Sequence, residues 1–462
     1  MRSILLGTRW FARFDSTSKA IILDVYTAMT SILKPDDSVP AIRRDFRWFF
    51  RLFVVWLGVS MTQVRAGDWP QIMGPNRNGI ADGETLIDRV PSQGIEVRWK
   101  YEVGEGFAGP AVHKNRVVVH HRLGRTEKVD CLDLASAKVL WSTDLPAGYQ
   151  PGINPDAGPR CVPTILKNER VITYSPNGQL SCLELKTGNL IWKRQLFEDY
   201  SGDENYFGAG STPLVLEDRV LVNIGGRRGK GVVAVSVADG KTLWTSTDEG
   251  TSYSAPIAIK WNQKQVAVFV TRLTTVGLDA ANGDVLFQIP FGKRGATVNA
   301  AMPLETPKGV LLSASYGIGA MMLQPAATQP KVIWESEDAL SSQYFTAVYK
   351  DGFLYGVDGR EDFQNTRLRC IDAATGKVQW TQENVPGGHL ILAGSQILMV
   401  DIEGGLRVFE ADPKKFQAVW EAQLHNAPGR SLPALSQGLV LVRTNAAAGR
   451  GTLTCAVVGK QP

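Results

Sequence analysis

A phrase that ends in tryptophan recurs along this chain and constrains its fold more than any other feature. Each copy is an apolar segment, a polar turn and a second apolar segment, and successive copies end 40 to 52 residues apart. The copies end at Trp141, Trp192, Trp244, Phe287, Trp334, Trp380 and Trp420. Self-similarity at such a period indicates a repeat protein in which every repeat is one supersecondary unit.

Each repeat is predicted to contain two β-hairpins. Strands A and B flank a polar turn such as Lys-Asn or Glu-Asp, strand C alternates into a second turn, and strand D carries the aromatic residue. A glycine lies four residues before that aromatic in four repeats, at Gly188, Gly240, Gly283 and Gly376. Glycine adopts the positive φ that a tight turn requires without a steric penalty. Two hairpins form a four-stranded antiparallel blade, so the chain is predicted to be an all-β propeller.

The number of strand starts predicts eight blades. Eight A strands begin, at Pro110, Pro163, Pro213, Pro256, Pro303, Thr346, Leu390 and Pro433. Seven D-strand aromatics follow the first of them, and the eighth, Trp99, precedes it. The N-terminal strand around Trp99 should therefore complete the last blade, which leaves no open edge between the two ends. Seven blades is the alternative, because the repeats near Trp334 and Trp420 lack the glycine turn.

We interpret the repeated aromatics as packing between neighbouring blades rather than as a row that stacks on ligands. Burying one aromatic side chain removes about 150–250 Å² from water, a large apolar contribution per repeat. The eight positions are Trp99, Trp141, Trp192, Trp244, Phe287, Trp334, Trp380 and Trp420.

The net positive charge of the chain comes from its first 66 residues. Residues 1–66 hold ten of the 50 Lys and Arg and five of the 45 Asp and Glu, which leaves 40 of each sign in residues 67–462. A nucleic-acid-binding protein needs a basic surface to neutralise phosphates, so this neutral part argues against nucleic acid as a partner.

The first 66 residues are predicted to be a leader with a signal peptide. Arginines from Arg43 to Arg51 precede the apolar run Leu52 to Met61, and Val64-Arg65-Ala66 ends in a cleavage pattern of small residues. The protein is therefore expected to be exported to a periplasmic or extracellular space. Membrane association is expected only through a partner or an uncleaved leader, which is the alternative. Residues 67–93 are predicted to form an N-terminal arm, and residues 94–462 the propeller.

The phrase Asp372 to Trp380, D-A-A-T-G-K-V-Q-W, resembles the pyrroloquinoline-quinone (PQQ)-type repeat. This repeat is found in quinoprotein dehydrogenases and in the BamB family of outer-membrane assembly proteins. The resemblance covers about residues 94–462 and implies a propeller, but not the cofactor. Catalytic members carry an adjacent Cys-Cys pair, a tryptophan beneath the quinone and a Ca²⁺ held by Glu and Asn with a nearby Asp base; this chain has no Cys-Cys dipeptide.

The A-strand starts, which line the central channel of a propeller, contain no carboxylate. A Ca²⁺ ion takes six to eight oxygen ligands and a general base needs an ionisable group, so no catalytic residue, cofactor or metal is predicted. The polar residues expected at the channel mouth are Arg160, Tyr253, Asn299, Gln343, Tyr344, His389 and Arg430. Arg160 and Arg430 are candidates for holding an anion or the carboxylate of a peptide.

The two longest D–A connections, 144–160 and 197–210, are expected on the same face as the channel mouth. Long loops on a rigid scaffold commonly carry binding residues. The second loop mixes aromatic and acidic side chains, with Tyr200, Asp203, Tyr206 and Phe207 as candidate rim residues. Such a mixture suits a protein or peptide contact; a solvated acidic loop is the alternative.

These observations favour an exported, non-catalytic propeller scaffold that binds protein or peptide partners in the cell envelope. The first alternative is a dehydrogenase that depends on PQQ and Ca²⁺. The second is a glycan-binding propeller whose loop aromatics stack on sugars.

Overall fold

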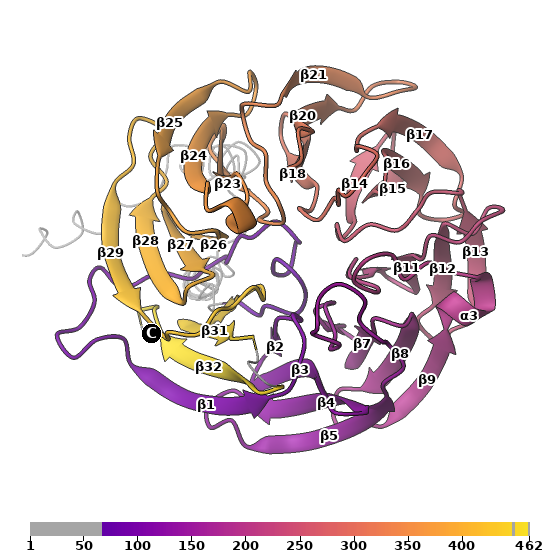
Figure 1. Cartoon of the computed structure of the whole chain (residues 1–462), viewed down its shortest axis with the longest axis horizontal. Coiled ribbons are helices and arrows are strands. Elements are labelled where there is room, and N and C mark those ends of the chain that lie inside the picture. Colours follow the sequence, from indigo (N-terminus) through magenta and orange to yellow (C-terminus); the bar gives the residue numbers. More distant parts are fainter. Residues whose placement is uncertain (1–66, 446–448, 461–462) are drawn as a thin grey trace, which may run out of the picture. The chain divides into compact units, whose positions relative to one another are not determined.

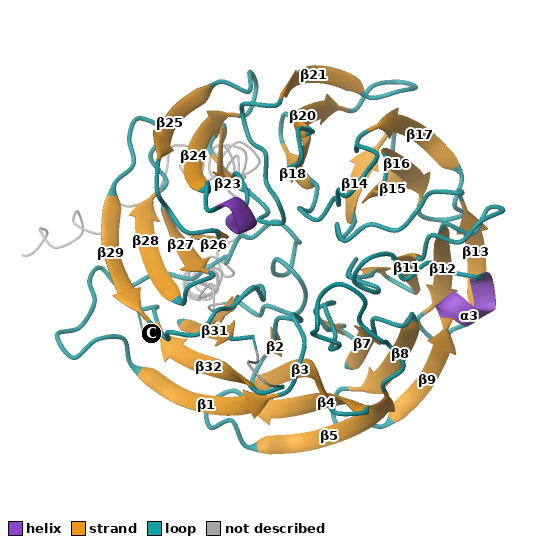
Figure 2. Ribbon diagram, in the orientation of Figure 1, coloured by secondary structure: helices purple, strands orange, loops and turns teal. Residues whose placement is uncertain are grey.

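The computed structural model describes residues 67–445 and 449–460, so the expected leader, residues 1–66, lies outside the described residues. The described chain forms eight four-stranded sheets arranged in a ring (Figures 1 and 2). The predicted eight-bladed β-propeller is confirmed, and the alternative of seven blades is wrong. Strand A of each blade lies nearest the centre and strand D lies at the rim (Figure 1). Among the described residues, the helices are α3 (Leu196–Tyr200) and η1 (Glu361–Phe363), and neither is long and apolar enough to cross a membrane.

Blades 1 to 7 hold strands A to D in chain order, and all pairings within them are antiparallel. The strands of blades 1 to 4 are β2 (Ala111–His113), β3 (Arg116–Leu123), β4 (Thr126–Asp133) and β5 (Val139–Pro146); β6 (Thr164–Ile165), β7 (Arg170–Tyr174), β8 (Gln179–Glu184) and β9 (Leu190–Gln195); β10 (Leu214–Leu216), β11 (Arg219–Asn223), β12 (Val232–Ser236) and β13 (Thr242–Ser246); β14 (Ile257–Trp261), β15 (Lys264–Val270), β16 (Thr274–Asp279) and β17 (Val285–Pro290).

The strands of blades 5 to 7 are β18 (Leu304–Thr306), β19 (Gly309–Ala314), β20 (Gly319–Gln324) and β21 (Lys331–Ser336); β22 (Val348–Lys350), β23 (Phe353–Asp358), β24 (Arg367–Asp372) and β25 (Val378–Gln382); β26 (Gly388–Ala393), β27 (Gln396–Asp401), β28 (Gly405–Glu410) and β29 (Ala418–Gln423).

Blade 8 combines the two ends of the propeller. Its inner strands are β30 (Ala434–Ser436), β31 (Leu439–Arg443) and β32 (Gly451–Val457), and its outer strand is β1 (Val97–Val103). Strand β1 pairs antiparallel with β32, with Trp99 opposite Cys455. The ring is therefore closed as the sequence predicts, by a strand from before the first blade.

The D-strand tryptophan joins each blade to the next one. The indole nitrogen of Trp141 donates a hydrogen bond to the carbonyl oxygen of Leu185 at 2.8 Å, at the start of the C–D turn of the following blade. The same bond recurs from Trp99 to Leu134, Trp192 to Val237, Trp244 to Ala280, Trp334 to Ala373 and Trp380 to Asp412. In blade 7, Trp420 donates instead to Ile87 of the N-terminal arm, whose backbone is bonded to Val458 at the end of blade 8. These indoles pack between blades, and none of them lines the central channel.

The glycines of the C–D turns are needed both for the turn itself and for the contact with the tryptophan of the preceding blade. Gly188 has a φ of +76°, and a Cβ atom added there would lie 2.5 Å from Cε3 of Trp141. Gly240, Gly283 and Gly376 also have positive φ and meet the ring of the preceding blade's tryptophan in the same way. Glycine is therefore required twice, because the backbone is left-handed and because the indole occupies the space of a side chain.

Blade 4 replaces this contact with another tryptophan. Its D-strand aromatic, Phe287, has no N–H group, and Trp261 at the end of β14 stacks on it with ring centroids 4.6 Å apart. The indole nitrogen of Trp261 donates to the carbonyl oxygen of Ala326 in blade 5 at 2.7 Å. The inter-blade bond is thus kept where the repeat pattern has lost it.

All five cysteines are buried and free. Four of them lie opposite a D-strand tryptophan in the sheet register, as the pairs Cys131–Trp141, Cys182–Trp192, Cys370–Trp380 and Cys455–Trp99. They occupy the same apolar position in different blades, which keeps them apart.

The N-terminal arm crosses the centre of the ring (Figure 1). Trp69 is 2% exposed and exchanges backbone hydrogen bonds with Val112 of blade 1. The buried guanidinium of Arg77 donates to the carbonyl oxygens of Thr212 and Pro213 in blade 3, both at 3.1 Å. Four residues further on, the backbone N–H of Ala81 donates to Leu392 in blade 7, on the opposite side of the ring. The arm therefore ties non-adjacent blades together across the centre of the ring.

We expect Gly188→Ala to destabilise the propeller by about 2–5 kcal/mol, the sum of a left-handed backbone in a residue with a side chain and a clash in packed surroundings. The matched control is Gly394→Ala, because Gly394 also has a positive φ of 62° but no atom lies within 4 Å of its added Cβ. That control should lose only about 1–2 kcal/mol. Urea and thermal unfolding of both variants would check this, and equal losses would contradict the proposed role of the indole contact.

Candidate functional site

A cavity of about 470 Å³ opens at the centre of the ring on the face where the D–A connections lie. All eight blades contribute to its wall through residues at or before their A strands, and Ile72 of the N-terminal arm also lines it. The arm, as well as the blades, therefore contributes to the wall. We call this hollow the mouth cavity.

Six of the seven residues predicted for the channel mouth line the mouth cavity, namely Arg160, Tyr253, Gln343, Tyr344, His389 and Arg430. Asn299 does not. Its side chain is turned inward, 2% exposed, and donates to the carbonyl oxygens of Thr271 and Phe291 at 2.8 and 3.2 Å. Asn299 therefore fixes the backbone of its own loops instead of facing a ligand.

The candidate rim residues divide into two pairs. Tyr206 and Phe207 line the mouth cavity, and the ring of Phe207 packs 5.4 Å from that of Tyr253. Tyr200 lies in α3, where its hydroxyl forms a hydrogen bond with Thr242 on the outer strand β13. Asp203 accepts a hydrogen bond from the backbone of Asn205 at 2.8 Å. These last two side chains stabilise the loop and do not face the cavity.

Three charged residues of the mouth cavity were not predicted, because they come from a connection between two strands and not from an A-strand start. Arg360, Glu361 and Asp362 lie at η1, in the connection between strands β23 and β24 of blade 6. The channel wall was predicted from A-strand starts alone, and those starts indeed hold no carboxylate. The charged insertion Gly359 to Thr366 between two strands was the signal available in the sequence.

The carboxylates of the mouth cavity are already paired. Glu361, whose side chain is 7% exposed, binds the Arg430 guanidinium at 2.6 Å and accepts a hydrogen bond from the Tyr344 hydroxyl. Asp362 binds Arg360 through both oxygens. Burial, followed by the neighbouring charge of Glu361, raises the pKa of Tyr344 well above its usual value, so this hydroxyl stays protonated and keeps donating.

Arg160 is held in place by backbone oxygens and aromatic rings. It donates to the carbonyl oxygens of Asp156 and Gly158, and its guanidinium lies 5.2 Å from the centre of the Tyr149 ring. Burial lowers the pKa of Arg160, partly offset by the charge of Asp156. The arginine is thus bonded within its own loop instead of projecting as a free anion-binding group.

His389 contributes to the wall of the mouth cavity and is 3% exposed. Its Nε2 atom is 3.0 Å from the carbonyl oxygen of Arg430, while Nδ1 is buried and has no hydrogen-bond partner among the described residues. A carbonyl only accepts hydrogen bonds, so Nε2 carries the proton and Nδ1 is a bare acceptor. Burial lowers the pKa of His389 to about 4, so the ring is neutral at pH 7.

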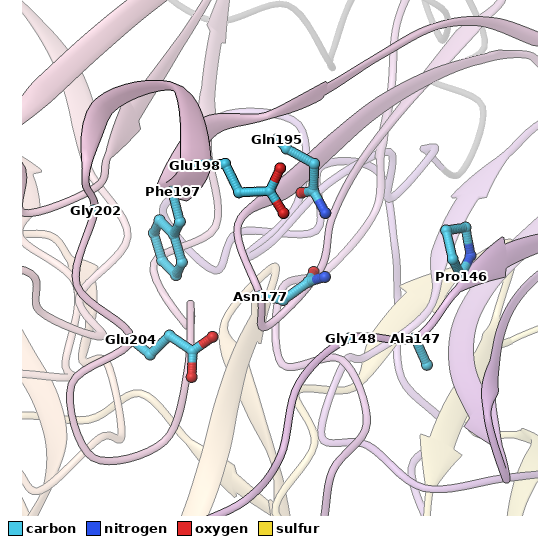
Figure 3. A pocket seen from close by; sticks show the side chains of 9 residues that line it. All are labelled: Pro146, Ala147, Gly148, Asn177, Gln195, Phe197, Glu198, Gly202 and Glu204. Atoms are coloured by element: carbon cyan, nitrogen blue, oxygen red, sulfur yellow. The ribbon is translucent and has the colours of Figure 1, made fainter.

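A second pocket of about 420 Å³ lies between the two long D–A connections (Figure 3). Pro146 and Ala147 belong to the first connection, and Glu198 and Glu204 to the second. Both glutamates are solvent-exposed; burial and the charge of Asp203 raise the pKa of Glu204. This open, acidic pocket matches the solvated loop that the sequence left as an alternative.

The residues of the mouth cavity do not fit the calcium ion of the catalytic PQQ propellers. No group of three or more His, Cys, Asp or Glu side chains within residues 67–445 and 449–460 is placed to hold a metal ion. The two carboxylates of the cavity, Glu361 and Asp362, are engaged by arginines. A Ca²⁺ ion takes six to eight oxygens, several of them charged, and this donor set does not supply them.

The neutral state of His389 predicts a pH dependence of stability. The unfolded histidine takes up a proton near pH 6.5, whereas the folded one does so only near pH 4. The unfolded chain therefore binds more protons in this interval, and the free energy of unfolding should fall by up to about 1.4 kcal/mol per pH unit as the pH is lowered from 6.5 to 4. Above pH 6.5 the ring is neutral in both the folded and the unfolded state, so His389 no longer makes the free energy of unfolding depend on pH.

Urea unfolding of the wild type and of His389→Asn at several pH values would measure this. Other histidines with a lowered pKa, His121 and His425, act in both proteins and cancel in the difference. Parallel curves for the two proteins would show that His389 takes up its proton normally in the folded state.

The sequence of the chain matches a family model and two groups of relatives. The model of the family described as "Outer membrane protein assembly factor BamB" matches residues 125–382 and 364–456. BamB of Moranella endobia is 22% identical over 392 residues, which cover 79% of this chain and 82% of that protein. The dehydrogenase subunit of the quinone-type alcohol dehydrogenase of Gluconobacter oxydans is 25% identical over 193 residues, or 38% of this chain and 24% of that protein.

Two groups of solved structures share the fold. BamB from Moraxella catarrhalis matches with a TM-score of 0.57 and 14% identity, over 78% of this chain and 97% of that one. Quinohemoprotein alcohol dehydrogenase from Comamonas testosteroni also matches with a TM-score of 0.57 and 14% identity, over 87% and 82%. Likeness at this identity concerns the fold alone. The family model, by contrast, covers most of the propeller sequence, and the chain belongs to the PQQ-like β-propeller family described as outer membrane protein assembly factor BamB.

Proposed function

We propose that this chain is an exported, non-catalytic scaffold that binds a protein or peptide partner of the cell envelope through the mouth cavity and its rim. The observation that carries the proposal is the chemistry of that face. Ile153 and Phe363, at 67% and 66% the most exposed of the large hydrophobic residues described, belong to the two segments that flank the cavity from blades 1 and 6. Exposed apolar residues around an aromatic hollow mark an interaction site.

The composition of the cavity supports a protein partner. Tyrosine, phenylalanine and arginine line it, the residue types that concentrate in the energetically dominant parts of protein interfaces. The relatives named for outer-membrane protein assembly, with coverage of most of both chains, agree with an envelope scaffold.

Covalent catalysis by Ser, Cys or Lys has no support in the residues that line the cavity. None of the described residues that line the cavity is Ser, Cys or Lys. The hydroxyls of Thr212 and Thr346 accept hydrogen bonds from backbone N–H groups of neighbouring blades. A hydroxyl nucleophile is activated by an adjacent base, whereas the hydrogen-bond partner of His389 is the carbonyl oxygen of Arg430.

The glycan-binding alternative has less support from the loop aromatics. Tyr200 is turned against strand β13, and Phe207 is packed against Tyr253. Part of the surface of these two rings is therefore already used for contacts inside the protein.

Photocrosslinking tests the partner proposal. A photoreactive amino acid placed at Ile153 or Phe363 should give one discrete, saturable adduct with an envelope protein, whereas the same amino acid at Val285 should not. Val285 is a matched control because it is 49% exposed but lies on the outer strand β17. Ile153→Asp and Phe363→Asp should each reduce adduct formation at the other position at least tenfold without lowering the melting temperature. Equal amounts of adduct at all three positions would contradict an interface at the mouth cavity.

The dehydrogenase alternative, which the Gluconobacter relative favours, is tested with the cofactor itself. Incubating the purified protein with PQQ and Ca²⁺ should give no stoichiometric quinone absorbance and no dye reduction with alcohols or aldose sugars. The physical reason is that Ca²⁺ would have to displace Arg430 and Arg360 from the two carboxylates of the cavity. Stoichiometric binding with turnover would overturn the scaffold proposal.

A further inference from the structure

A buried hydrogen-bond network joins blade 8 to blade 1 at the place where the ring closes. His121 of β3 is 1% exposed, and its Nε2 atom lies 2.7 Å from the carboxylate of Asp130 on β4. Its Nδ1 atom accepts the backbone N–H of Gly104, the residue after β1, at 2.9 Å. The hydroxyl of Tyr101 on β1 also donates to Asp130, at 2.8 Å. The two blades therefore share one imidazole and one carboxylate.

These bonds fix the protonation state of His121. Burial alone would raise the pKa of Asp130, but its hydrogen bonds, that from His121 first, hold it below its usual value, so Asp130 is a carboxylate that only accepts. The proton of the imidazole therefore lies on Nε2, and Nδ1 is the acceptor for Gly104. A second proton can bind only at Nδ1, where it would face the N–H of Gly104. The charged form of His121 is thus incompatible with the bond that holds Gly104.

The backbone around Gly104 is packed too closely to adjust by a small rotation. A Cβ atom added to Gly104 would lie 1.9 Å from the carbonyl oxygen of Arg122, and Glu105 exchanges two backbone hydrogen bonds with Arg122, at 2.8 and 2.9 Å. Arg443 of β31 donates to the carbonyl oxygens of Gly104 and Glu105. If the bond from Gly104 to His121 is lost, the segment has to move as a unit.

This segment, residues 104–108, also supports the rim of the mouth cavity, and we call it the seam segment. The backbone N–H groups of Phe107 and Ala108 donate to the carbonyl oxygen of Pro159, at 2.8 and 2.9 Å. The backbone N–H of Ala157 donates to the carboxylate of Glu105 at 3.1 Å. Phe107 itself lines the cavity. The position of the seam segment is therefore passed on to the blade 1 side of the mouth.

The surroundings of His121 favour its neutral form as long as the seam is closed. Burial lowers the pKa of His121; the hydrogen bond and charge of Asp130 oppose this, and the charges of Arg443 and His120 lower the pKa further. The titratable and charged groups around the ring are Asp130 and Glu127 of β4, Tyr101 of β1, His120 of β3 and Arg443 of β31, and Glu127 is itself 2.9 Å from His120. Once water reaches the imidazole, its pKa returns towards 6.5.

We propose that His121 is an acid-sensitive switch: its neutral ring closes the seam between blades 8 and 1, and proton uptake at Nδ1 releases the seam segment and loosens the blade 1 side of the mouth. The open form binds more protons than the closed form below pH 6.5. The ratio of open to closed molecules should therefore rise by up to about tenfold per pH unit as the pH falls below 6.5, until the closed form also becomes protonated.

Hydrogen–deuterium exchange of the full chain tests this, with each amide rate corrected to a protection factor between about pH 7.5 and pH 5. Protection of the seam segment and of Ala157 should be constant above pH 6.5 and fall by up to about tenfold per pH unit below it. Blade 4 holds no histidine, and the amides of its strands β15 and β16 should keep their protection.

Two variants separate His121 from the other histidines. His121→Gln keeps an N–H donor for Asp130 and an oxygen acceptor for Gly104 but takes up no proton in this range, so protection of the seam segment should no longer depend on pH. His425→Asn is the matched control, because burial also lowers the pKa of His425 but this residue lies between blades 7 and 8. It should show the acid dependence of the wild type.

NMR of labelled histidine rings in the wild type gives a readout that needs no variant to fold. His121 should be the Nε2–H tautomer at pH 7 and should gain its second proton below pH 6.5, together with the loss of protection. Constant protection of the seam segment down to pH 5, an equal loss in blade 4, or a titration of His121 at or above pH 6.5 would each overturn the inference. An undiminished acid dependence in His121→Gln would overturn it as well.

Discussion

The structure depends on one contact repeated around most of the ring, in which the indole of one blade lies on the C–D turn of the next and donates to a carbonyl there. A net hydrogen bond contributes about 1 kcal/mol, and the buried ring adds its apolar surface. The contact also fixes geometry, because an indole that must meet both a left-handed glycine and a particular carbonyl permits one spacing between blades. The A strands are thereby held at constant positions around the axis, and the mouth cavity is defined by where they start.

A ring also needs its ends joined, and here several devices act at the same place. Strand β1 completes blade 8, and the fully buried Arg443 of that blade donates to four carbonyl oxygens of the segment 104–120, those of Gly104, Glu105, Ala108 and His120. Burial lowers the pKa of Arg443 to about 10, so the guanidinium remains charged at neutral pH. The N-terminal arm then spans the centre and bonds to opposite blades. Because Ile72 of this arm also lines the mouth cavity, the segment that secures the ring also shapes the candidate site.

The repeat phrases were sufficient to predict the fold, the number of blades and the strand that closes the ring, because each depends on local turn chemistry and on counting. Six mouth residues were predicted for the same reason, since every A strand starts at the channel. Glu361 and Asp362 were missed because they reach the channel from a B–C connection, and the pairing of Glu361 with Arg430 joins two blades that only the three-dimensional structure brings together. Asn299 and Tyr200 lie at predicted positions along the chain, but local hydrogen bonds turn their side chains away from the cavity.

The charges of the mouth cavity are balanced within the protein, which limits what the cavity can bind. A carboxylate can bind a metal ion or a substrate only when its oxygen lone pairs are not already engaged by other groups. Glu361 is almost fully buried, yet it is held by an arginine and a tyrosine from two different blades, so its charge is balanced inside the protein. Such a group stiffens the rim and leaves the centre of the cavity uncharged. The arrangement favours an uncharged ligand over a charged one, because a charged group would have to compete with these ion pairs for their partners.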